Sequence, residues 1–374
     1  LDSHGNGQFF EATNLCSPNF KTVARDKDDL AALLYSSGTT GLPKGIMLTH
    51  NNLLVNAKCL VTYWGFSEKD RLLHLLPIFH VHGLFVALGC ILLSGGTMRW
   101  ADKFKPDYVN QYLFECTTMM GVPTYYTRLL SDPNFSKKHI QNMRLFTSGS
   151  APLLIETFND FRDRTGFEIL ERYGMTETGM NCSNPLNRQR KPGTVGPPLP
   201  GVKARIVNAS GKNVCANEVG DLQIKGDNVF KGYWEMPEKT KEDFTKDGFF
   251  NTGDQATLDK DGYVSIVGRS KDMIISGGLN VYPKEVEDIL DEFKGIRESA
   301  VFGVDHADLG EAVVAVIVLS EGSNIDLDNV INYSKEKLAN YKVPKHIEVI
   351  SNLPRNTMSK VQKKVLRNSY KDIF

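Results

Sequence analysis

The chain has 374 residues, of which 41% are hydrophobic and 24% charged, a composition typical of a globular protein with two or more domains. Lys+Arg and Asp+Glu both number 44, so no overall field favours binding to nucleic acid or to an anionic membrane. The 6 cysteines form no Cys-x-x-Cys pair, which favours reduced thiols over a disulfide framework or a zinc site. No apolar run reaches membrane-spanning length. We therefore expect a soluble intracellular protein.

A polar loop lies between an apolar run at 30–34, which we expect to be a buried strand, and a helical pattern at 49–64. The loop reads Tyr-Ser-Ser-Gly-Thr-Thr-Gly-Leu-Pro-Lys-Gly across residues 35–45. Its glycines would let backbone N–H groups approach an anion closely, and Lys44 would add a positive charge. The spacing differs from the Walker pattern. An ordinary mobile turn is the alternative to a phosphate-binding loop.

Residues 1–29 are polar and carry no strong periodic signal, but strands and helices alternate from residue 71 to residue 178. The expected strands are 71–76, 97–100, 117–122, 143–147 and 167–170, and the expected helices are 84–93, 109–114 and 153–165. This alternation is typical of βαβ units around a parallel sheet, in which ligands bind beyond the carboxyl ends of the strands. Unusual polar residues follow the expected strands, namely residues 36–44, His80, His82, Thr124, Ser148, Ser150 and residues 173–177.

Between residues 193 and 268 the sequence consists of short runs in which apolar and polar residues alternate, a pattern typical of strands. A charged segment at 268–272 resembles a linker, and an α+β pattern follows it. The expected elements of that pattern are helices at 284–292 and 327–340 and strands at 298–304, 313–319 and 346–350. We therefore predict an α/β protein. Its large N-terminal domain, 1–270, would combine βαβ units with a distorted β subdomain, and 271–374 would form a small, mobile α+β domain.

Five motifs in a fixed order resemble the adenylate-forming superfamily of acyl-CoA synthetases, luciferases and peptide-synthetase adenylation domains. They are Ser37-Gly38-Thr39-Thr40-Gly41-Leu42-Pro43-Lys44-Gly45, Tyr173-Gly174-Met175-Thr176-Glu177, Thr252-Gly253-Asp254, Gly268-Arg269-Ser270-Lys271-Asp272, and Pro354-Arg355 with Lys360. The resemblance covers residues 28–368. Within the superfamily, the segments at 76–83, 120–128 and 170–178 are similar to malonyl-CoA synthetases. The resemblance implies that an acid and ATP form an acyl-adenylate and pyrophosphate, after which the CoA thiol displaces AMP.

Two departures from the family pattern bear on activity. Only about 35 residues precede the loop, whereas family members carry a longer N-terminal portion, so we expect an N-terminally incomplete adenylation domain. Ser359 stands where the family usually has glycine before Lys360, and a side chain there restricts the backbone. The chain begins at Leu1 without a signal or transit pattern. The sequence therefore leaves open the cytoplasm or the mitochondrial matrix, and also the oligomeric state.

The resemblance assigns residues to the nucleotide, to Mg²⁺ and to catalysis. The implied ATP- and AMP-binding residues are Ser37, Gly38, Thr39, Thr40, Gly41, Lys44, Ser150, Ala151, Pro152, Tyr173, Gly174, Met175, Thr176, Asp254, Arg269 and Lys360. Among them, Tyr173 would stack on adenine, and Asp254 would accept the ribose hydroxyls. Glu177 would hold Mg²⁺, which prefers one or two carboxylates together with phosphate oxygens. The implied catalytic residues are Lys360, Thr40, Glu177 and His82.

Movement of the small domain would serve the second half-reaction. Lys360 would first meet the attacking carboxylate and the α-phosphate, where negative charge concentrates. Rotation about the hinge position Lys271 would then bring Gly277, Gly278 and Leu279 against the pantetheine arm of CoA. Two successive glycines permit close backbone approach to a thin ligand, but they are equally compatible with an ordinary turn.

Two arginines point to a diacid substrate. Arg172 stands immediately before the Tyr-Gly-Met-Thr-Glu motif, and Arg128 follows the segment 121–124 closely enough to reach the same pocket. A guanidinium matches a carboxylate bidentately, and a buried charge without a partner costs roughly 3–5 kcal/mol. We expect Arg172, Arg128 and Ser148 to bind the far carboxylate. The alternatives are that Arg172 pairs with Glu171 or Glu168, that Arg128 is a surface residue, and that His82 is a packed histidine.

The sequence therefore predicts an ATP-dependent ligase that joins malonate or methylmalonate to CoA, with ATP, CoA and Mg²⁺ as cofactors and no nucleic-acid partner. A monocarboxylate–CoA ligase of the medium-chain or coumarate kind is one alternative. A non-catalytic nucleotide-binding remnant is another, motivated by the short N-terminus and by Ser359.

Overall fold

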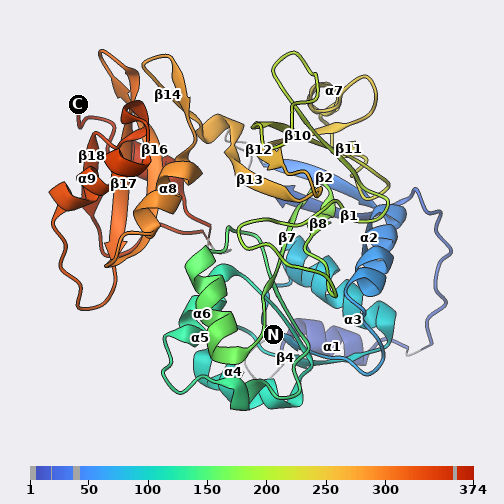
Figure 1. Cartoon of the computed structure of the whole chain (residues 1–374). Helices are drawn as coiled ribbons and strands as arrows, with labels where there is room; N and C mark the ends of the chain where they lie inside the picture. Colours follow the sequence, from blue (N-terminus) through green and yellow to red (C-terminus); the bar gives the residue numbers. More distant parts are fainter. Residues whose placement is uncertain (1–5, 18, 37–42, 357–359) are drawn as a thin grey trace.

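The computed structural model describes residues 6–17, 19–36, 43–356 and 360–374. Figure 1 shows a large part, coloured from blue to yellow, and a C-terminal part in orange and red that lies beside the β12–β13 end of the large part. Within the described ranges, no helix combines the length and apolarity needed to cross a membrane.

The main sheet confirms the predicted parallel βαβ arrangement. Its strands pair in the order β4 (Thr97–Trp100), β3 (Arg71–His74), β5 (Thr118–Gly121), β6 (Leu145–Ser148), β7 (Leu170–Met175) and β8 (Gly179–Ser183). Neighbours from β4 to β7 are parallel, and β8 is antiparallel to β7. The sheet is accompanied by α2 (His50–Tyr63), the π-helical turn η1 (His82–Ala87), α3 (Leu88–Ser94), α4 (Pro106–Tyr112), η2 (Leu113–Glu115), α5 (Pro123–Leu130), η3 (Lys137–Ile140) and α6 (Ile155–Thr165).

The central strands β3, β5 and β6 are buried on both faces, as is typical of a parallel sheet covered on both sides. Leu72 and Leu145 belong to one core, which contains residues of α2 and α3, whereas Leu73 and Phe146 belong to a second core with residues of α4 to α6. Successive residues of a strand point to opposite faces. The carboxyl ends of the strands are thereby held between two packed layers.

Two antiparallel sheets complete the large part. The first pairs β1 (Leu30–Ser36), β2 (Lys44–Thr49) and β11 (Gly232–Tyr233), and the second pairs β13 (Val264–Arg269), β12 (Phe250–Leu258), β10 (Gly220–Lys225) and β9 (Lys203–Val207). The helices α1 (Gln8–Asn14) and α7 (Pro237–Asp243) also belong to the large part.

Three expectations for the N-terminal region were wrong in detail. The strand at 30–34 exists but is not buried: it lies at the edge of its sheet, and Leu30 is 43% exposed. Lys44 begins β2 rather than ending a loop, and α1 falls in a region for which we expected no regular structure. An apolar run alone does not distinguish a central strand from an edge strand.

The C-terminal part has a sheet and helices of its own, as expected. β15 (Leu279–Val281), β14 (Ile274–Ser276), β17 (Gly310–Leu319) and β16 (Ile296–His306) pair in that order, and β18 (His346–Val349) adds to β17. The helices are α8 (Pro283–Asp291), α9 (Leu327–Lys337), η5 (Asn340–Lys342) and α10 (Lys363–Ser369), and the short turn η4 (Ser270–Asp272) connects β13 to β14. The exact domain boundary after residue 270 stays a prediction.

Asp70 joins the amino ends of three strands of the main sheet. Its carboxylate, 3% exposed, accepts hydrogen bonds from Nε and Nη2 of Arg144 at 2.7 and 2.8 Å. It also accepts from Thr117 Oγ1 at 2.7 Å and from the Ser67 N–H at 2.8 Å. Because these residues precede β3, β5 and β6, one buried carboxylate fixes the start of all three strands.

Replacement of Arg144 by Met should therefore destabilise the protein by about 3 kcal/mol, because it leaves Asp70 buried and unpaired. The same change at Arg162, whose ion pair with Asp163 is exposed, should cost less than about 1 kcal/mol. Urea unfolding measures both values. Equal losses in Arg144→Met and Arg162→Met would contradict this role of Asp70.

His74, at the end of β3, should make the protein sensitive to acid. It is 1% exposed, its ring lies 4.5 Å from that of Trp100, and neither ring nitrogen has a partner within the described part of the chain. Burial lowers the pKa of His74 from 6.5 to about 4. Between these values the unfolded chain binds more protons than the folded chain, so stability falls as the pH falls.

Replacement of His74 by Phe keeps an aromatic ring beside Trp100 and removes the titration. The slope of the unfolding free energy between pH 6 and pH 4.5 should decrease by up to about 1.4 kcal/mol per pH unit. Chemical denaturation at a series of pH values measures this slope. An unchanged slope would show that His74 is not the group that responds to acid.

Candidate functional site

One strand, β7, carries the centre of the candidate site. We expected a strand at 167–170 followed by a loop, but β7 runs from Leu170 to Met175. Arg172 and Tyr173 are therefore strand residues, and they point to opposite faces because side chains alternate along a strand. Arg172 points toward His82, and Tyr173 points toward Asp254. β7 thus contributes to two separate groups of residues.

Arg172 is buried, and within the part of the chain that the structure describes it has no counter-charge. It is 3% exposed, its Nη2 contacts Nε2 of His82, and its Nε has no partner within the described residues. The guanidinium lies against Gly149, where it occupies the space that a Cβ would need. Burial lowers the pKa of Arg172 to about 10, so the side chain remains a cation at neutral pH.

The acids that we weighed as partners of Arg172 are engaged elsewhere. Oε1 of Glu171 accepts the N–H of Gly193 at 3.0 Å, and burial raises the pKa of Glu171 to about 8. The backbone carbonyl of Glu168 accepts a hydrogen bond from Arg190, and the charge of the Glu168 carboxylate acts on the pKa of the same arginine. No ion pair between Arg172 and an acidic side chain is found within the described ranges, so the structural alternative that we weighed for this arginine is not supported.

His82 connects Arg172 to the segment after β6. It is 1% exposed, and its Nδ1 lies 3.2 Å from Oγ of Ser150. Because arginine can only donate, Nε2 of His82 must accept, and the ring proton must be on Nδ1, directed at Ser150. Burial, followed by the Arg172 charge, lowers the pKa of His82 well below its ordinary value. The ring is therefore neutral.

Asp254 is the centre of the second group. It is 4% exposed; Oδ2 accepts from the Tyr173 hydroxyl at 2.5 Å, and Oδ1 accepts from Nε of Arg269 at 2.7 Å. Each oxygen has two lone pairs, so each can accept one further hydrogen bond. Glu177, in the turn between β7 and β8, is 9% exposed, and burial raises its pKa. Arg269 and Lys44 act in the opposite direction on Glu177.

Lys360 brings the C-terminal part to this site. Its backbone N–H donates to Oδ1 of Asn356 and its carbonyl accepts from the Asn356 N–H, both at 3.0 Å. Desolvation lowers the pKa of Lys360, and the charges of Arg269 and Arg172 lower it further. Asp254 and Glu177 act in the opposite direction. A lysine from the C-terminal part therefore lies within the electrostatic field of both groups on the large part.

The remaining predicted nucleotide residues are only partly described. Ser37, Gly38, Thr39, Thr40 and Gly41 lie outside the described residues. Lys44 lies 4.0 Å from Oδ2 of Asp243 and 4.8 Å from the ring centre of Tyr233. Ser150, Ala151 and Pro152 follow β6, Gly174 and Met175 end β7, and Thr176 follows β7.

The structure does not bring the three predicted carboxylate ligands together. Arg128 is exposed on α5. Ser148 is buried, with an unpartnered hydroxyl within the described part of the chain, but it pairs with Glu171 across the sheet. Paired residues of parallel strands point to the same face, so the Ser148 side chain points to the face opposite to that of Arg172. Only Arg172 fits the expected pocket.

Sequence reasoning missed Tyr233 and Asp243, which lie beside Lys44 and Glu177. Burial, followed by the charges of Glu177 and Asp243, raises the pKa of Tyr233 far above its ordinary value. Their position depends on the pairing of β11 with β2, which joins segments almost two hundred residues apart in the sequence. No local sequence pattern predicts such a contact.

The residues predicted for CoA and for the hinge are exposed. Gly277 and Gly278 form the turn of the β14–β15 hairpin with φ of 59° and 76°, and such a turn requires positive φ at both positions. The hairpin alone therefore accounts for the two glycines. Leu279 is 49% exposed, and Lys271 is exposed in η4.

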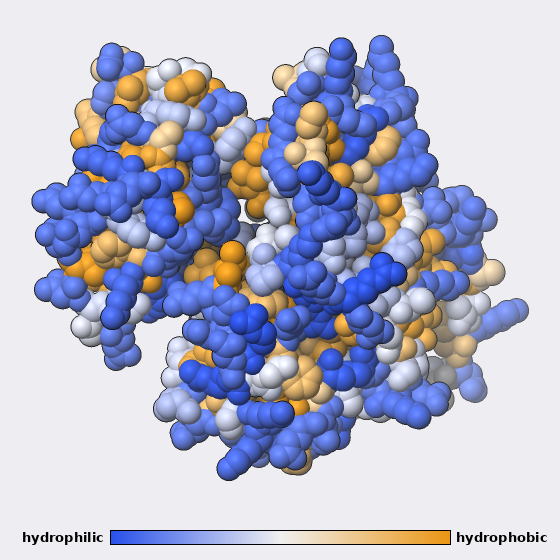
Figure 2. All heavy atoms as spheres, viewed as in Figure 1, coloured by the Kyte–Doolittle hydropathy of each residue, from blue (hydrophilic) through white to orange (hydrophobic). Residues whose placement is uncertain are grey.

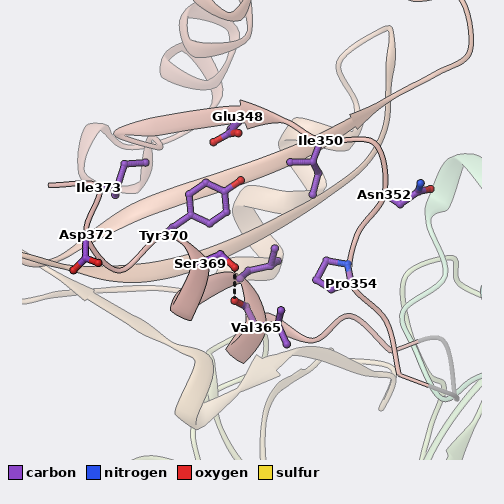
Figure 3. Close-up of a pocket in the computed structure, with 10 residues that line it drawn as sticks. Glu348, Ile350, Asn352, Pro354, Val365, Ser369, Tyr370, Asp372 and Ile373 are labelled. Atoms are coloured by element: carbon purple, nitrogen blue, oxygen red, sulfur yellow. Dashed lines mark hydrogen bonds between the residues drawn. The ribbon is translucent and has the colours of Figure 1, made fainter.

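Hollows lie in and beside the C-terminal part. Figure 2 shows the surface indented between this part and the large part. A separate cavity of about 650 Å³ lies within the C-terminal part, between β18 and α10 (Figure 3). Its lining residues are Glu348, Ile350, Asn352, Pro354, Val365, Leu366, Ser369, Tyr370, Asp372 and Ile373. None of the predicted site residues lines this cavity.

Comparison with known proteins gives relatives over most of the chain. The chain is 38% identical to a malonate–CoA ligase of Arabidopsis thaliana over 94% of its own length, but it spans only 62% of that enzyme. It is 37% identical to a feruloyl-CoA synthase of an Amycolatopsis species, covering 92% of this chain and 70% of that one.

Solved structures of MatB from Rhodopseudomonas palustris are 52% identical to the chain and cover 99% of it, while the chain covers 74% of MatB. The TM-score is 0.97 for the ATP-bound form and 0.82 for the apo form. The overall arrangement of the chain is thus closer to that of ATP-bound MatB than to that of apo MatB.

Family models match both parts of the chain. Residues 3–234 match the model described as AMP-binding enzyme, and residues 285–360 match the model described as AMP-binding enzyme C-terminal domain. Together with the ordered motifs and the fold, these matches show that the chain belongs to the family of AMP-binding enzymes.

Proposed function

We propose that the protein is an ATP-dependent acid–CoA ligase that forms malonyl-CoA from malonate, ATP and CoA. An acyl-adenylate would form first, with release of pyrophosphate, and CoA would then displace AMP. Methylmalonate is a second substrate of the same chemistry. The observation that carries the choice of a diacid is the buried guanidinium of Arg172, which has no acidic partner within the described residues.

A buried cation without a partner is unfavourable by roughly 3–5 kcal/mol. The far carboxylate of a short diacid would supply the missing charge and could accept the N–H of Nε, whereas an uncharged acyl chain would leave both unsatisfied. The pocket would therefore discriminate against monoacids through the cost of an unpaired charge. The similarity to a malonate–CoA ligase of Arabidopsis thaliana supports the same choice.

Adenylation needs charge neutralisation around the α-phosphate. We assign this role chiefly to Lys360, an exposed lysine whose pKa responds to the charges of Arg269, Asp254, Glu177 and Arg172. Asp254 retains one acceptor site on each oxygen, which suits a pair of ribose hydroxyls. The closer similarity to the ATP-bound form of MatB supports a domain arrangement suited to this half-reaction.

Glu177 fits a magnesium ligand. Its carboxylate is buried beside Lys44 and Asp254, and Mg²⁺ commonly takes one or two carboxylates with phosphate oxygens and water. Within the described residues, no group of three or more His, Cys, Asp or Glu side chains could hold a metal. The ion would therefore reach Glu177 together with the nucleotide, and it would neutralise phosphate charge when bound.

The thioester-forming half-reaction involves the C-terminal part. We propose that the C-terminal part turns at Lys271 and presents Gly277, Gly278 and Leu279 to CoA. Support comes from the exposure of these residues and from their place at the start of the C-terminal part. We also keep residues 270 and 271 as the proposed domain boundary.

A monocarboxylate–CoA ligase is the second candidate. The similarity to a feruloyl-CoA synthase, at 37% identity, favours it. In that case Arg172 would serve to brace the pocket through His82 rather than to bind a second carboxylate.

Malonate-dependent exchange between ATP and pyrophosphate tests the proposal. Lys360→Ala should abolish exchange with every acid, because it removes the cation at the reacting centre. Arg172→Ala should lower kcat/KM for malonate by about a hundredfold, which corresponds to about 3 kcal/mol, and should affect octanoate or coumarate little. Arg162→Ala, which removes an exposed arginine, serves as the control.

Equal losses with every acid in Arg172→Ala would refute the diacid pocket. Faster exchange with octanoate or coumarate than with malonate would establish the second candidate. If ATP binds but no acid supports exchange, the protein binds the nucleotide without adenylating an acid.

A further inference from the structure

The imidazole of His82 lies between Arg172 and Ser150 and contacts both. We infer that His82 is a positioning residue for the diacid pocket: as a neutral acceptor it orients the guanidinium of Arg172, and Ser150 fixes the tautomer that makes this possible. This inference rests on the proposed function, because it concerns how the same pocket selects a second carboxylate.

The choice of a neutral acceptor matters for charge. A carboxylate in place of His82 would also orient Arg172, but it would neutralise the guanidinium and remove the reason to bind an anion. Neutral imidazole accepts one N–H and leaves the charge in place. Nε of Arg172 remains without a partner within the described residues. As a neutral acceptor, His82 fixes the guanidinium and leaves its positive charge free, which a carboxylate could not do.

The backbone after β6 holds this arrangement in one geometry. Gly149 has no Cβ, and the guanidinium occupies that space. Ser150 adopts φ of 68°, a left-handed conformation that is uncommon for residues other than glycine, asparagine and aspartate. This conformation accompanies the 3.2 Å contact between Oγ of Ser150 and Nδ1 of His82. Strained backbone persists where the surroundings determine it, and it is frequent at functional sites.

The neighbours of His82 keep the ring uncharged. It is 1% exposed, and the charged and titratable groups that act on it are Arg172, His80, His74 and Lys360, none of which is acidic. A proton on Nε2 would direct an N–H at the guanidinium of Arg172 and break the contact. Only the tautomer with the proton on Nδ1 satisfies Arg172 and Ser150 together.

Substitution of His82 by glutamine or by asparagine distinguishes the functions of the two ring nitrogens. In His82→Gln, the longer side chain can place its amide oxygen near the position of Nε2 and accept from Arg172. In His82→Asn, the shorter side chain reaches only the position of Nδ1, near Ser150. A residue that merely fills space would tolerate both changes equally.

Steady-state exchange kinetics with malonate and ATP measure the difference. We expect His82→Asn to raise KM for malonate by about tenfold or more, the effect of losing one hydrogen bond to a charged group. KM for ATP should change little, and His82→Gln should recover most of the loss. In the Arg172→Ala background, His82→Asn should add no further loss for malonate, because its effect acts through the arginine.

Three outcomes would overturn the inference while wild-type exchange with malonate remains. These are equal effects of Gln and Asn, an equal rise in KM for ATP, and a loss that persists in Arg172→Ala. Absence of malonate-dependent exchange in the wild type would instead overturn the proposed function. If thermal unfolding shows that His82→Asn is not folded, Ser150→Ala carries the same test, because it removes the hydroxyl beside His82 and keeps the backbone that the resemblance assigns to the nucleotide. A malonate-specific rise in KM that disappears in Arg172→Ala supports the inference, and a rise that persists refutes it.

Discussion

The alternation of side chains along β7 is the constraint on which the candidate site depends. Because neighbouring residues of an extended chain face opposite sides, Arg172 and Tyr173 serve different groups although they are adjacent in sequence. Arg172 meets His82 on one side, and Tyr173 meets Asp254 on the other. A shift of β7 by one residue would move each of its side chains to the opposite face and separate both groups of residues. The register of β7 against β6 and β8 therefore matters more to the site than any single hydrogen bond.

Cations and acids of the site act on one another at close quarters. The charges of Arg269, Asp254, Glu177 and Arg172 act on Lys360, and those of Arg269 and Lys44 act on Glu177. Burial strengthens each of these interactions, because the effective dielectric constant inside a protein is lower than in water. Such an environment suits a reaction in which two anions, a carboxylate and a phosphate, must approach each other.

Much of the fold could be predicted from the sequence, because strand and helix patterns are local. The parallel sheet, the order of elements and the independent C-terminal sheet all follow from alternation and turn residues. Burial was harder to predict: the apolar run in β1 lies at a sheet edge, and Arg128 falls on the exposed face of α5 while Tyr126 and Leu129 are buried. The helical period could have revealed this last point, since residues 126 and 129 share one face of α5.

The contacts within the candidate site could not be predicted in the same way. Motifs indicate which residues gather at the strand ends, but the contact between His82 and Arg172 joins residues that no periodic pattern relates. Equally, nothing local predicts that Asp243 lies near Lys44 or that Ser148 points away from Arg172. These contacts depend on strand pairing and on the direction of each side chain, which the tertiary structure determines.

The two partners of Asp254 have a mechanical consequence. Tyr173 belongs to β7, whereas Arg269 is the last residue of β13, directly before the short turn that leads to the C-terminal sheet. One carboxylate thus ties the strand at the centre of the site to the segment from which the C-terminal part departs. A ligand that competes for the oxygens of Asp254 would also weaken the contact with Arg269. Occupancy of the site and orientation of the C-terminal part would therefore be coupled through the two carboxylate oxygens of Asp254.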